Sequence, residues 1–432
     1  MNVLQVVHFY PPQSMGGCEL YTRDLARELS RWCTVEVFCT VPESCHPPEP
    51  SPEQSICTAI RKDYATFGNP FHERDAKVEA AFAALLNRLQ PDIIHVQHLM
   101  NLSLRLPLIA HKSGIPLVYT LHDFWLMCPR AFLLTADLQV CSGSSAVHCT
   151  ACLESNMRLF KTSTYTNRPS ALARQITKLC WNGYEKLRFM FAVRLWRRFW
   201  VKKIIHSVDF FIAPSQFLKL QYERFGIPAE KILFLTHGIS SQSVPRTTTA
   251  SSPPRFLFIG SLHVHKGVEL LIDAFNKIDK PCTLQVYGSG PAAYVEKLRA
   301  RCTTQQVLFK GQLAEHDRWG VLADSDALIV PSLCYENAPL VILEAFAAKV
   351  PVIAAGHGGM AELVHNGVNG FTFTPGSSES LARVITQCLD NPALLAQCAA
   401  GIKPVKSLGE HAQEILAVYN TLLQKKHHRR KE

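Results

Sequence analysis

The feature that most constrains this chain is a repeated alternation of apolar runs of strand length with helical segments. In the first half, the segment 18–31 places Leu20, Leu25 and Leu29 near one face of a helix between two such runs. Strands that alternate with helices favour a parallel sheet covered by helices. The expected strands of this half are 2–10, 34–40, 92–97, 116–123 and 208–215.

A second series of the same kind follows the stretch 241–254, whose Pro, Ser and Thr content is typical of a linker. The 432 residues are enough for two domains of about 200 residues each. We therefore predict an α/β protein with two doubly wound parallel sheets that face a cleft between the domains. The expected strands of the second half are 255–262, 282–290, 306–312, 326–332 and 350–356. The predicted ranges are 1–240 for the N-terminal domain, 255–406 for the C-terminal domain and 407–432 for a closing helix with a basic tail.

Composition limits the class of protein further. Apolar residues make up 47% of the chain, no stretch approaches a membrane span, and the first residues do not form a signal peptide. Fifteen scattered cysteines do not resemble a disulfide scaffold, so we expect a protein of the reducing cytoplasm. The net charge of +10 is concentrated at 194–203 and 425–432, which predicts contact with an anionic surface rather than a nucleic-acid groove.

Two glutamates, Glu336 and Glu344, stand eight positions apart in the stretch YENAPLVILEAFAAKVPVIAAGHGG (335–359). On one continuous helix their side chains would lie about 80° apart and would not share a face. Pro339, between them, is favoured in the first turn of a helix and disfavours a helical residue before it. We therefore expect a helix that begins near Pro339 and a loop that places Glu336 beyond the carboxyl end of a parallel strand, where such sheets bind ligands.

The start of this helix adds a second binding element. Its first backbone N–H groups, at Leu340, Val341 and Ile342, would point into the same region and favour an anion. Two carboxylates and a helix N-terminus suit a polyhydroxylated anion, and a nucleoside diphosphate sugar is such a ligand.

Glycine loops follow other expected strands. Gly16 and Gly17 precede a helix, where glycines let a phosphate approach the backbone, although a glycine pair is often only a turn. In GSLHVHKG (260–267), Gly260 ends a strand and Lys266 is placed to bind phosphate, although a solvated lysine before a helix has the same pattern. Neither loop fits a P-loop or a dinucleotide fingerprint.

His122, with Asp123 after it, ends another expected strand. In that position its ring can bind a sugar hydroxyl or merely cap a turn, and both interpretations stay open.

Together these segments resemble glycosyltransferase family 4, the retaining nucleotide-sugar enzymes of GT-B fold with two Rossmann-like domains. The resemblance covers nearly the whole chain and rests on five motifs in the order of the family. They are MGGCE (15–19), LHD (121–123), GSLHVHKG (260–267), the two glutamates with seven residues between them, and GGMAELVHNGVNGF (358–371). One departure is Ser261, which stands where many members have an arginine.

The resemblance implies a role for each matching residue. Glu344 would hold the ribose of a UDP- or GDP-sugar, and Lys266 would neutralise its diphosphate. The implied catalytic residues are Lys266, Glu336 and His122, the last two beside the donor sugar, with retention of configuration and no metal cofactor. The implied nucleotide-sugar-binding residues are Gly16, Gly17, Gly260, Ser261, Lys266, Gly288, Asn337, Pro339, Leu340, Val341 and Glu344.

Four cysteines follow His122 in the loop 124–160, namely Cys128, Cys141, Cys149 and Cys152. The CxxC at 149–152 has the spacing of a zinc site, and the other two thiols would complete a tetrahedral set. The irregular gaps also fit four ordinary thiols in a packed loop, so a structural zinc and free thiols both stay open.

A basic aromatic helix is expected at about 184–205. Placed at 100° per residue, its basic side chains fall on one half and its aromatic side chains on the other. The basic set is Lys186, Arg194, Arg197, Arg198 and Lys202, and the aromatic set is Phe189, Trp196, Phe199 and Trp200. Such a helix can lie on an anionic membrane, or its aromatic half can belong to the core.

We therefore predict a cytoplasmic, retaining glycosyltransferase that moves a hexosyl unit from a nucleotide sugar to a glycan or lipid-linked glycan acceptor in polysaccharide biosynthesis. Peripheral contact with the inner face of the cell membrane is expected, and a nucleic-acid partner is not. The alternatives are a sucrose- or sugar-phosphate-synthase-like enzyme of the same fold and, in a different class, a zinc-dependent nucleic-acid-binding or scaffold protein.

Overall fold

The computed structural model describes residues 1–42, 56–62, 74–143, 149, 152, 197–240 and 253–429. The chain divides into two compact units and passes between them more than once. Unit 1 comprises Met1–Ile212, Phe225–Leu233 and Leu416–Glu432, and unit 2 comprises Ala213–Arg224 and Phe234–Ile415. Most of the linker that the sequence predicts at 241–254 lies outside the described residues.

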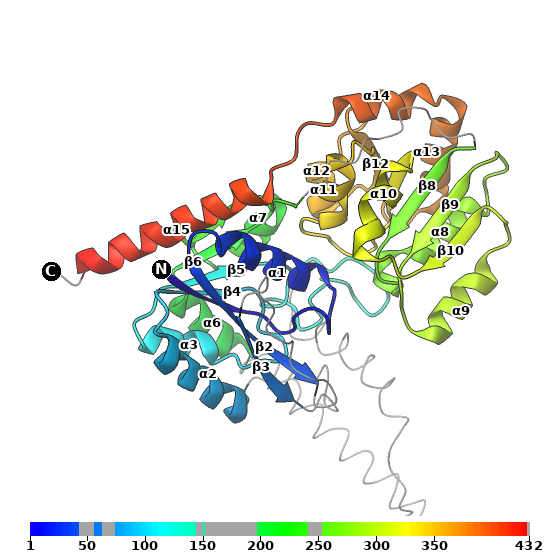
Figure 1. The fold of residues 1–432 in the computed structure, drawn as a ribbon. Coiled ribbons are helices and arrows are strands. Elements are labelled where there is room, and N and C mark those ends of the chain that lie inside the picture. Colours follow the sequence, from blue (N-terminus) through cyan, green and yellow to red (C-terminus); the bar gives the residue numbers. More distant parts are fainter. Residues whose placement is uncertain are drawn as a thin grey trace, which may run out of the picture. The chain divides into compact units, whose positions relative to one another are not determined.

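The first sheet has the strand order β3-β2-β1-β4-β5-β6-β7, and its neighbours from β3 to β6 run parallel. Figure 1 shows α2, α3 and α6 together on one side of these strands and α1 on the other, so the sheet is covered on both faces. The strands are β1 (Asn2–Val6), β2 (Thr34–Pro42), β3 (Ile56–Lys62), β4 (Ile93–Val96), β5 (Leu117–Thr120), β6 (Phe210–Ala213) and β7 (Ile232–Phe234). The helices of this half are α1 (Gly17–Leu29), α2 (Ala76–Leu89), α3 (Leu106–Lys112), α6 (Arg197–Ser207), α7 (Gln216–Phe225) and the short η2 (Ala229–Lys231).

The second sheet, in unit 2, has the order β10-β9-β8-β11-β12-β13, again with parallel neighbours. Its strands are β8 (Arg255–Ile259), β9 (Thr283–Tyr287), β10 (Val307–Gly311), β11 (Ala327–Val330), β12 (Val352–Ala355) and β13 (Gly370–Phe373). The helices are η3 (Val264–Lys266), α8 (Val268–Phe275), α9 (Ala292–Arg301), η4 (Glu315–Asp317), α10 (Arg318–Ala323), α11 (Leu340–Ala347), α12 (Gly358–Leu363), α13 (Ser378–Asp390), α14 (Ala393–Gly401) and α15 (Leu408–Arg429). Two parallel α/β sheets confirm the predicted fold class.

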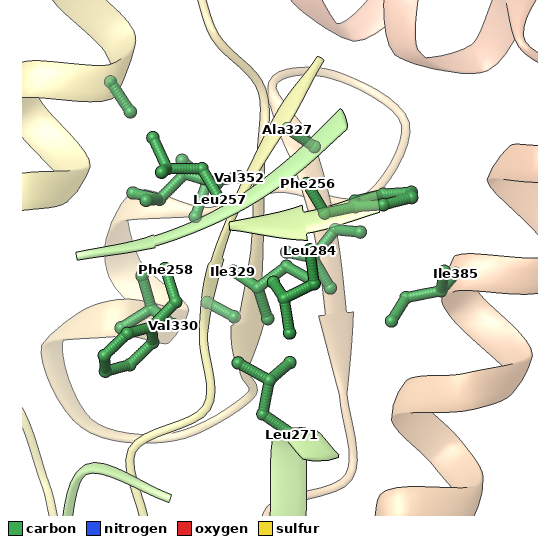
Figure 2. Packing of buried hydrophobic residues seen from close by; sticks show 14 of the residues in the cluster. Phe256, Leu257, Phe258, Leu271, Leu284, Ala327, Ile329, Val330, Val352 and Ile385 are labelled. Atoms are coloured by element: carbon green, nitrogen blue, oxygen red, sulfur yellow. The ribbon is translucent and has the colours of Figure 1, made fainter. Parts of the chain in front are cut away.

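Strands of unit 2 appear in the sequence as continuous apolar runs because they are buried on both faces of the sheet. All four residues of β11 and all four of β12 are buried, because helices cover the sheet on both faces. Figure 2 shows Leu271 of α8 and Ile385 of α13 beside Leu284 and Phe256 of the strands. Burying each such side chain stabilises the unit by about 1.5–3 kcal/mol.

Capping residues determine where several helices begin. Asp75 precedes α2, and its side chain accepts a hydrogen bond from the N–H of Val78 over 3.1 Å. Ser377 caps α13 in the same way through Ser380, also over 3.1 Å. Each cap satisfies a backbone donor that the first turn of a helix leaves without a partner.

The predicted basic aromatic helix is described only from residue 197 onward, where it forms α6, and its members at 186–196 lie outside the described residues. One member of the predicted basic set does not face outward. Arg197 is buried and stacks on the ring of Trp125 at 4.7 Å, because a guanidinium can pack flat on an aromatic face. In the predicted aromatic set, Trp200 is buried, whereas Phe199 is 48% exposed and does not belong to the core.

Among the described residues, no helix combines the length and the hydropathy that a membrane span requires.

Candidate functional site

The candidate site in unit 2 is built around the contact between Lys266 and Glu336. Lys266 ends η3 after strand β8, and Glu336 lies in the loop between β11 and α11. Nζ of Lys266 is 2.6 Å from Oε1 of Glu336, and the hydroxyl of Ser332 donates to the same oxygen over 2.7 Å. The sequence predicts both residues at the site but does not predict that they contact each other.

This contact sets the charges of both groups. Burial opposes ionisation of Glu336, but the charge of Lys266 and hydrogen bonds from Lys266 and Ser332 outweigh it and lower the pKa of the carboxyl group. Burial also opposes the charge of Lys266, and the carboxylate of Glu336 outweighs it, so the pKa of the ammonium group is raised. The pair is therefore ionised at neutral pH, and with 29% of the Lys266 side chain exposed an incoming anion can reach the cation.

One side of the Glu336 loop is fixed by the turn that carries Lys266. Gly267 has a φ of +72°, and a Cβ there would lie only 2.0 Å from the carbonyl oxygen of Pro331. The N–H of Leu333 donates to the carbonyl of His265 over 2.9 Å. Glycine is required at this position because the two backbones meet there.

The other side of the loop is fixed by the turn between β12 and α12. The N–H of Gly359 donates to the carbonyl of Glu336 over 2.7 Å, and a Cβ at Gly359 would lie 1.7 Å from the carbonyl oxygen of Asn337. Nε2 of His357 donates to the carbonyl of Ser332 over 3.0 Å. The late glycine segment of the sequence thus acts as a backbone clamp on the loop that carries Glu336.

The helix start beyond Glu336 is where the sequence predicts it. Pro339 is the N-cap and α11 runs from Leu340, so Pro339 begins the helix and supplies no donor of its own. The expectation for Ile342 is wrong, because its N–H already donates to the carbonyl of Pro339 over 3.0 Å. Leu340 and Val341 are left as the predicted anion donors.

Glu344 pairs with a cation that the sequence does not single out. Nη1 of Arg318, the first residue of α10, donates to Oε1 of Glu344 over 2.7 Å. Both side chains are mostly buried. Glu344 therefore holds an ion pair in this structure, and its binding to a ribose stays a prediction.

The glycine loops after β8 and β9 lie side by side. A Cβ at Gly288 would lie 1.8 Å from the carbonyl oxygen of Gly260, and the N–H of Gly260 donates to the carbonyl of Tyr287 over 3.1 Å. Ser261 is exposed beside this contact. The structure thus brings Gly260, Ser261 and Gly288 together at the carboxyl edge of the second sheet, the edge where ligands bind in such folds.

In unit 1, Gly16 is the N-cap of α1 and Gly17 is its first residue. The carboxylate of Glu19 folds back over this helix start, so that a Cβ at Gly16 would lie 2.5 Å from Oε2 of Glu19. Oε1 of Glu19 accepts from the Ser14 hydroxyl over 2.8 Å and lies 3.4 Å from Nε2 of His8. The helix start thus faces a carboxylate of the chain itself, and phosphate binding by the two glycines stays a prediction.

His122 and its neighbours stand at the carboxyl ends of β4 and β5. Nε2 of His122 lies 2.9 Å from the side-chain oxygen of Gln97, to which it donates. His98 accepts the N–H of Met100 at Nδ1 over 3.0 Å, so its ring proton is on Nε2, 3.0 Å from Oδ2 of Asp123.

A third histidine, His8, follows β1 and packs against His98 with ring centroids 4.5 Å apart and ring planes inclined by 49°. Burial, with the nearby His98, holds the pKa of His8 well below its usual value, so this ring is neutral at neutral pH. The sequence interpretation includes His122 but misses His8, Gln97 and His98. The signal was present, because each is a polar residue within two positions of the end of an apolar strand.

The four cysteines of the predicted zinc site are described, and they contact other groups. Sγ of Cys141 donates to the carbonyl of Gly143 over 3.2 Å, and Nη1 of Arg130 donates to Sγ of Cys152 over 3.3 Å. In the described part of the chain, no three His, Cys, Asp or Glu side chains are grouped to hold a metal. Zinc binding by Cys128, Cys141, Cys149 and Cys152 stays a prediction, which metal analysis of protein purified without chelator tests.

Two family models match the chain, one in each half. Residues 15–151 match the model of Glycosyltransferase Family 4, and residues 253–391 match that of Glycosyl transferases group 1. The two matches contain every residue that the sequence predicts to bind a nucleotide sugar.

Relatives with curated names are similar over part of their length. Glycogen synthase of Mycobacterium tuberculosis (strain H37Rv) is 30% identical over 40% of this chain and 43% of its own length. Alpha-D-kanosaminyltransferase of Streptomyces kanamyceticus is 26% identical over 45% of this chain and 56% of its own length. Phosphatidyl-myo-inositol mannosyltransferase of Mycobacterium leprae is 26% identical over 52% of this chain and 61% of its own length. The chain thus spans about half the length of these relatives.

Solved structures are similar in fold over nearly the whole chain. HepE of Anabaena in complex with UDP and glucose superposes with a TM-score of 0.65 at 20% identity, over 98% of this chain and 100% of that structure. Sucrose-phosphate synthase of Thermosynechococcus elongatus gives 0.68 at 18% identity, over 98% and 99% of the two chains. WaaG, a glycosyltransferase involved in lipopolysaccharide biosynthesis, gives 0.60 at 17% identity, over 96% and 99%. These likenesses show the GT-B fold.

Proposed function

Because this chain belongs to glycosyltransferase family 4, we propose that it transfers a hexosyl unit from a nucleotide diphosphate sugar to a glycan or lipid-linked glycan acceptor. The donor is a UDP- or GDP-sugar, the configuration at the anomeric carbon is retained, and the reaction belongs to polysaccharide biosynthesis. The family match and the names of the relatives support a glycosyl transfer. A structural neighbour in complex with UDP-glucose supports the class of donor.

The observation that carries this proposal is the ion pair of Lys266 and Glu336 beside the start of α11. Breaking the anomeric bond builds negative charge on the leaving diphosphate and positive charge on the sugar ring. Lys266 and the N–H groups of Leu340 and Val341 stabilise the first charge, and the carboxylate of Glu336 stabilises the second. These groups lie close together in the structure before any donor is bound.

The proposed chemistry needs no metal and no protein nucleophile. Lys266 takes the place of a divalent cation at the diphosphate, since an ammonium group neutralises phosphate charge as a point charge. Ser261 stands where many family members have an arginine, so we assign more of this work to Lys266 than in those members. Retention follows when the leaving phosphate takes the proton of the acceptor on the same face of the sugar. His122, a hydrogen-bond donor to Gln97, is the proposed contact of unit 1 with the sugar.

Two measurements on the purified protein test the donor class. Thermal unfolding is followed with UDP, GDP and AMP, and nucleoside diphosphate release is followed with a panel of UDP- and GDP-sugars. One of the two diphosphates at a hundredfold excess over its Kd should stabilise the protein by about 2.7 kcal/mol, and AMP should not. Stabilisation by neither, together with salt-dependent binding of an oligonucleotide, would favour the nucleic-acid-binding alternative instead. Fructose 6-phosphate as acceptor separates the sugar-phosphate synthase alternative, and the anomeric configuration of the product, read by NMR, tests retention.

We also propose that α6 contacts an anionic membrane, where a lipid-linked acceptor would be found. Arg198, Lys202 and Lys203 are exposed, and Nζ of Lys203 lies 5.5 Å from the ring centroid of the exposed Phe199. Nζ of Lys425, in the basic end of α15, lies 5.0 Å from the ring centroid of Phe210, shortly after α6. Basic residues around an exposed aromatic ring suit an anionic interface.

Flotation with vesicles tests the membrane contact. Vesicles with anionic lipid should carry the protein and neutral vesicles should not. The double substitution Lys202→Glu and Lys203→Glu should abolish the difference, whereas Lys310→Glu, an exposed lysine of unit 2, should leave it. Equal flotation with both lipids would refute the contact.

A further inference from the structure

Cys39 and Cys57 face each other on neighbouring strands of unit 1. Cys39 lies in β2 and Cys57 in the edge strand β3, and their Sγ atoms are 3.3 Å apart. In the register of the two strands, Cys39 pairs with Ala59 and Cys57 with Val37. The cysteines are therefore diagonal neighbours, and their side chains leave the sheet on the same face, since side chains two positions apart on a strand share a face.

We propose that Cys39 and Cys57 are a redox modification site, at which a reversible disulfide fastens the edge strand β3 to β2. A disulfide bond is about 2.05 Å long, so the two sulfur atoms need to approach each other by only about 1.3 Å from their present 3.3 Å. Neither cysteine belongs to the groups that we assign to glycosyl transfer, and the proposal stands apart from that function.

Other described thiols have different partners. Sγ of Cys33 donates to the carbonyl of Leu29 over 3.3 Å, and Sγ of Cys302 donates to the carbonyl of Thr304 over 3.2 Å. Sγ of Cys282 donates to the side-chain oxygen of Gln306 over 2.8 Å. Cys39 and Cys57 differ from these three cysteines, because each has the thiol of the other as its partner and not an oxygen atom.

The two thiols differ in access, and this difference orders the reaction. Cys39 is completely buried, whereas Cys57 is half-buried and can meet a small oxidant. The thiol–thiol hydrogen bond and burial raise the pKa of Cys39 well above its usual value, which disfavours its thiolate. We therefore place the first step at Cys57 and the second at Cys39, which compensates for its weak ionisation by its closeness.

The oxidant of the proposed step is a small disulfide such as oxidised glutathione. The Cys57 thiolate attacks one glutathione sulfur, forms a mixed disulfide and releases one glutathione. Sγ of Cys39 then attacks Sγ of Cys57 and releases the second glutathione. The two cysteines lose two electrons to the glutathione disulfide, and their two protons end on the two released glutathione thiols.

The test uses the full chain, incubated in buffers of graded oxidised-to-reduced glutathione ratio, then alkylated, digested and analysed by mass spectrometry. We expect a peptide pair that joins Cys39 to Cys57, a loss of two alkylatable thiols per chain, and recovery of both thiols after dithiothreitol. The variants Cys57→Ser and Cys57→Ala should lose the cross-link. The matched variant Cys33→Ser, at another half-buried cysteine of unit 1, should keep it.

Three results would overturn the proposal. Both thiols could stay alkylatable at every ratio, Cys57 could stop at the mixed disulfide with glutathione, or the lost thiols could map to other cysteines. Circular dichroism of each variant shows whether it is folded, so that a missing cross-link is not confused with an unfolded chain.

Discussion

At the scale of single residues, the candidate site in unit 2 holds its charges in pairs. Lys266 pairs with Glu336, and Arg318 pairs with Glu344. A partly buried charge needs such a partner, because desolvation costs more than a lone charge can recover. A diphosphate that binds here would compete with a carboxylate for the same cation, which ties donor binding to a rearrangement of these pairs.

The first prediction concerns Lys266. In Lys266→Ala, turnover should fall by at least about 10²-fold, because the leaving diphosphate loses its cation. The measurement is the steady-state release of nucleoside diphosphate by the purified variant. Lys277→Ala removes a lysine that pairs with Glu379 on the surface and should leave turnover unchanged. Near-normal turnover in Lys266→Ala would refute the assignment.

The second prediction concerns His411, which is fully buried in α15. Burial and the positive charge of Lys406 both lower the pKa of His411, and a hydrogen bond with the backbone of Thr236 only partly offsets them. The pKa falls from 6.5 to about 4. Between pH 6.5 and 4, His411 is protonated in the unfolded chain but not in the folded protein. The contribution of this group to folding stability is therefore complete above pH 6.5 and is lost as the pH falls toward 4. Between pH 7.5 and pH 5 the loss from this group should be about 2 kcal/mol.

Urea unfolding at pH 7.5, 6 and 5 measures this loss. The variant His411→Gln should lose about 2 kcal/mol less than the original chain over this range, because glutamine does not titrate. His316→Gln, at an exposed position, should follow the original chain. Identical pH dependence in His411→Gln and the original chain would contradict the prediction.

The local elements of the candidate site were predictable, whereas the contacts between its side chains were not. Pro339 marks the helix start and Glu336 the loop before it, since proline acts locally on the backbone. The pairing of Lys266 with Glu336 joins residues 70 positions apart, and that of Arg318 with Glu344 joins residues 26 apart. Such contacts form because the fold brings separate loops together at one edge of the sheet, and a local sequence pattern does not indicate which loops meet.

At the scale of elements, the turn between β12 and α12 holds the loop between β11 and α11. The two connections meet through backbone atoms at Gly359, so their separation leaves no room for a side chain. The sequence predicted β11, β12 and α11 well, because buried strands and a proline-started helix are locally encoded. It missed the edge strand β3 and the strand β13. The sequence of β3 is partly polar, and β13 has only four residues and begins with a glycine, so neither shows a clear periodic pattern.

The third prediction concerns this turn. Gly359→Ala should lower the free energy of unfolding by about 1–3 kcal/mol, because its Cβ would overlap the carbonyl oxygen of Asn337. Gly320→Ala, in the helix α10 with open space around its Cβ, should raise it by about 0.5–1 kcal/mol. Chemical unfolding of both variants measures the two changes, and an equal effect of the two substitutions would show that the turn has room to spare.

At the scale of the whole molecule, α15 starts in unit 2 and continues into unit 1. In unit 1 its Tyr419 is fully buried, and the hydroxyl lies 2.6 Å from Nδ1 of His95 in β4. Nε2 of the same ring lies 2.7 Å from the hydroxyl of Thr120 in β5. The sequence predicted a closing helix within 407–432 but not its partner, since the pattern of an amphipathic helix does not indicate which core the helix packs against.

The fourth prediction concerns this contact. Tyr419→Phe should lower the free energy of unfolding by about 1–3 kcal/mol, because a buried polar atom of His95 loses its hydrogen bond. Tyr10→Phe is a matched control in the same unit, since the buried hydroxyl of Tyr10 makes no hydrogen bond within the described residues. Thermal and urea unfolding measure both variants. A control as unstable as Tyr419→Phe would assign the loss to the missing oxygen atom alone.

The contact between His95 and Tyr419 joins positions 324 apart. On the ribosome, β4 emerges long before Tyr419 is translated, and all of unit 2 is made in between. The part of the unit 1 core that α15 covers therefore stays exposed until residues around Tyr419 have been translated. Chaperones that shield apolar surface would be needed most during that interval.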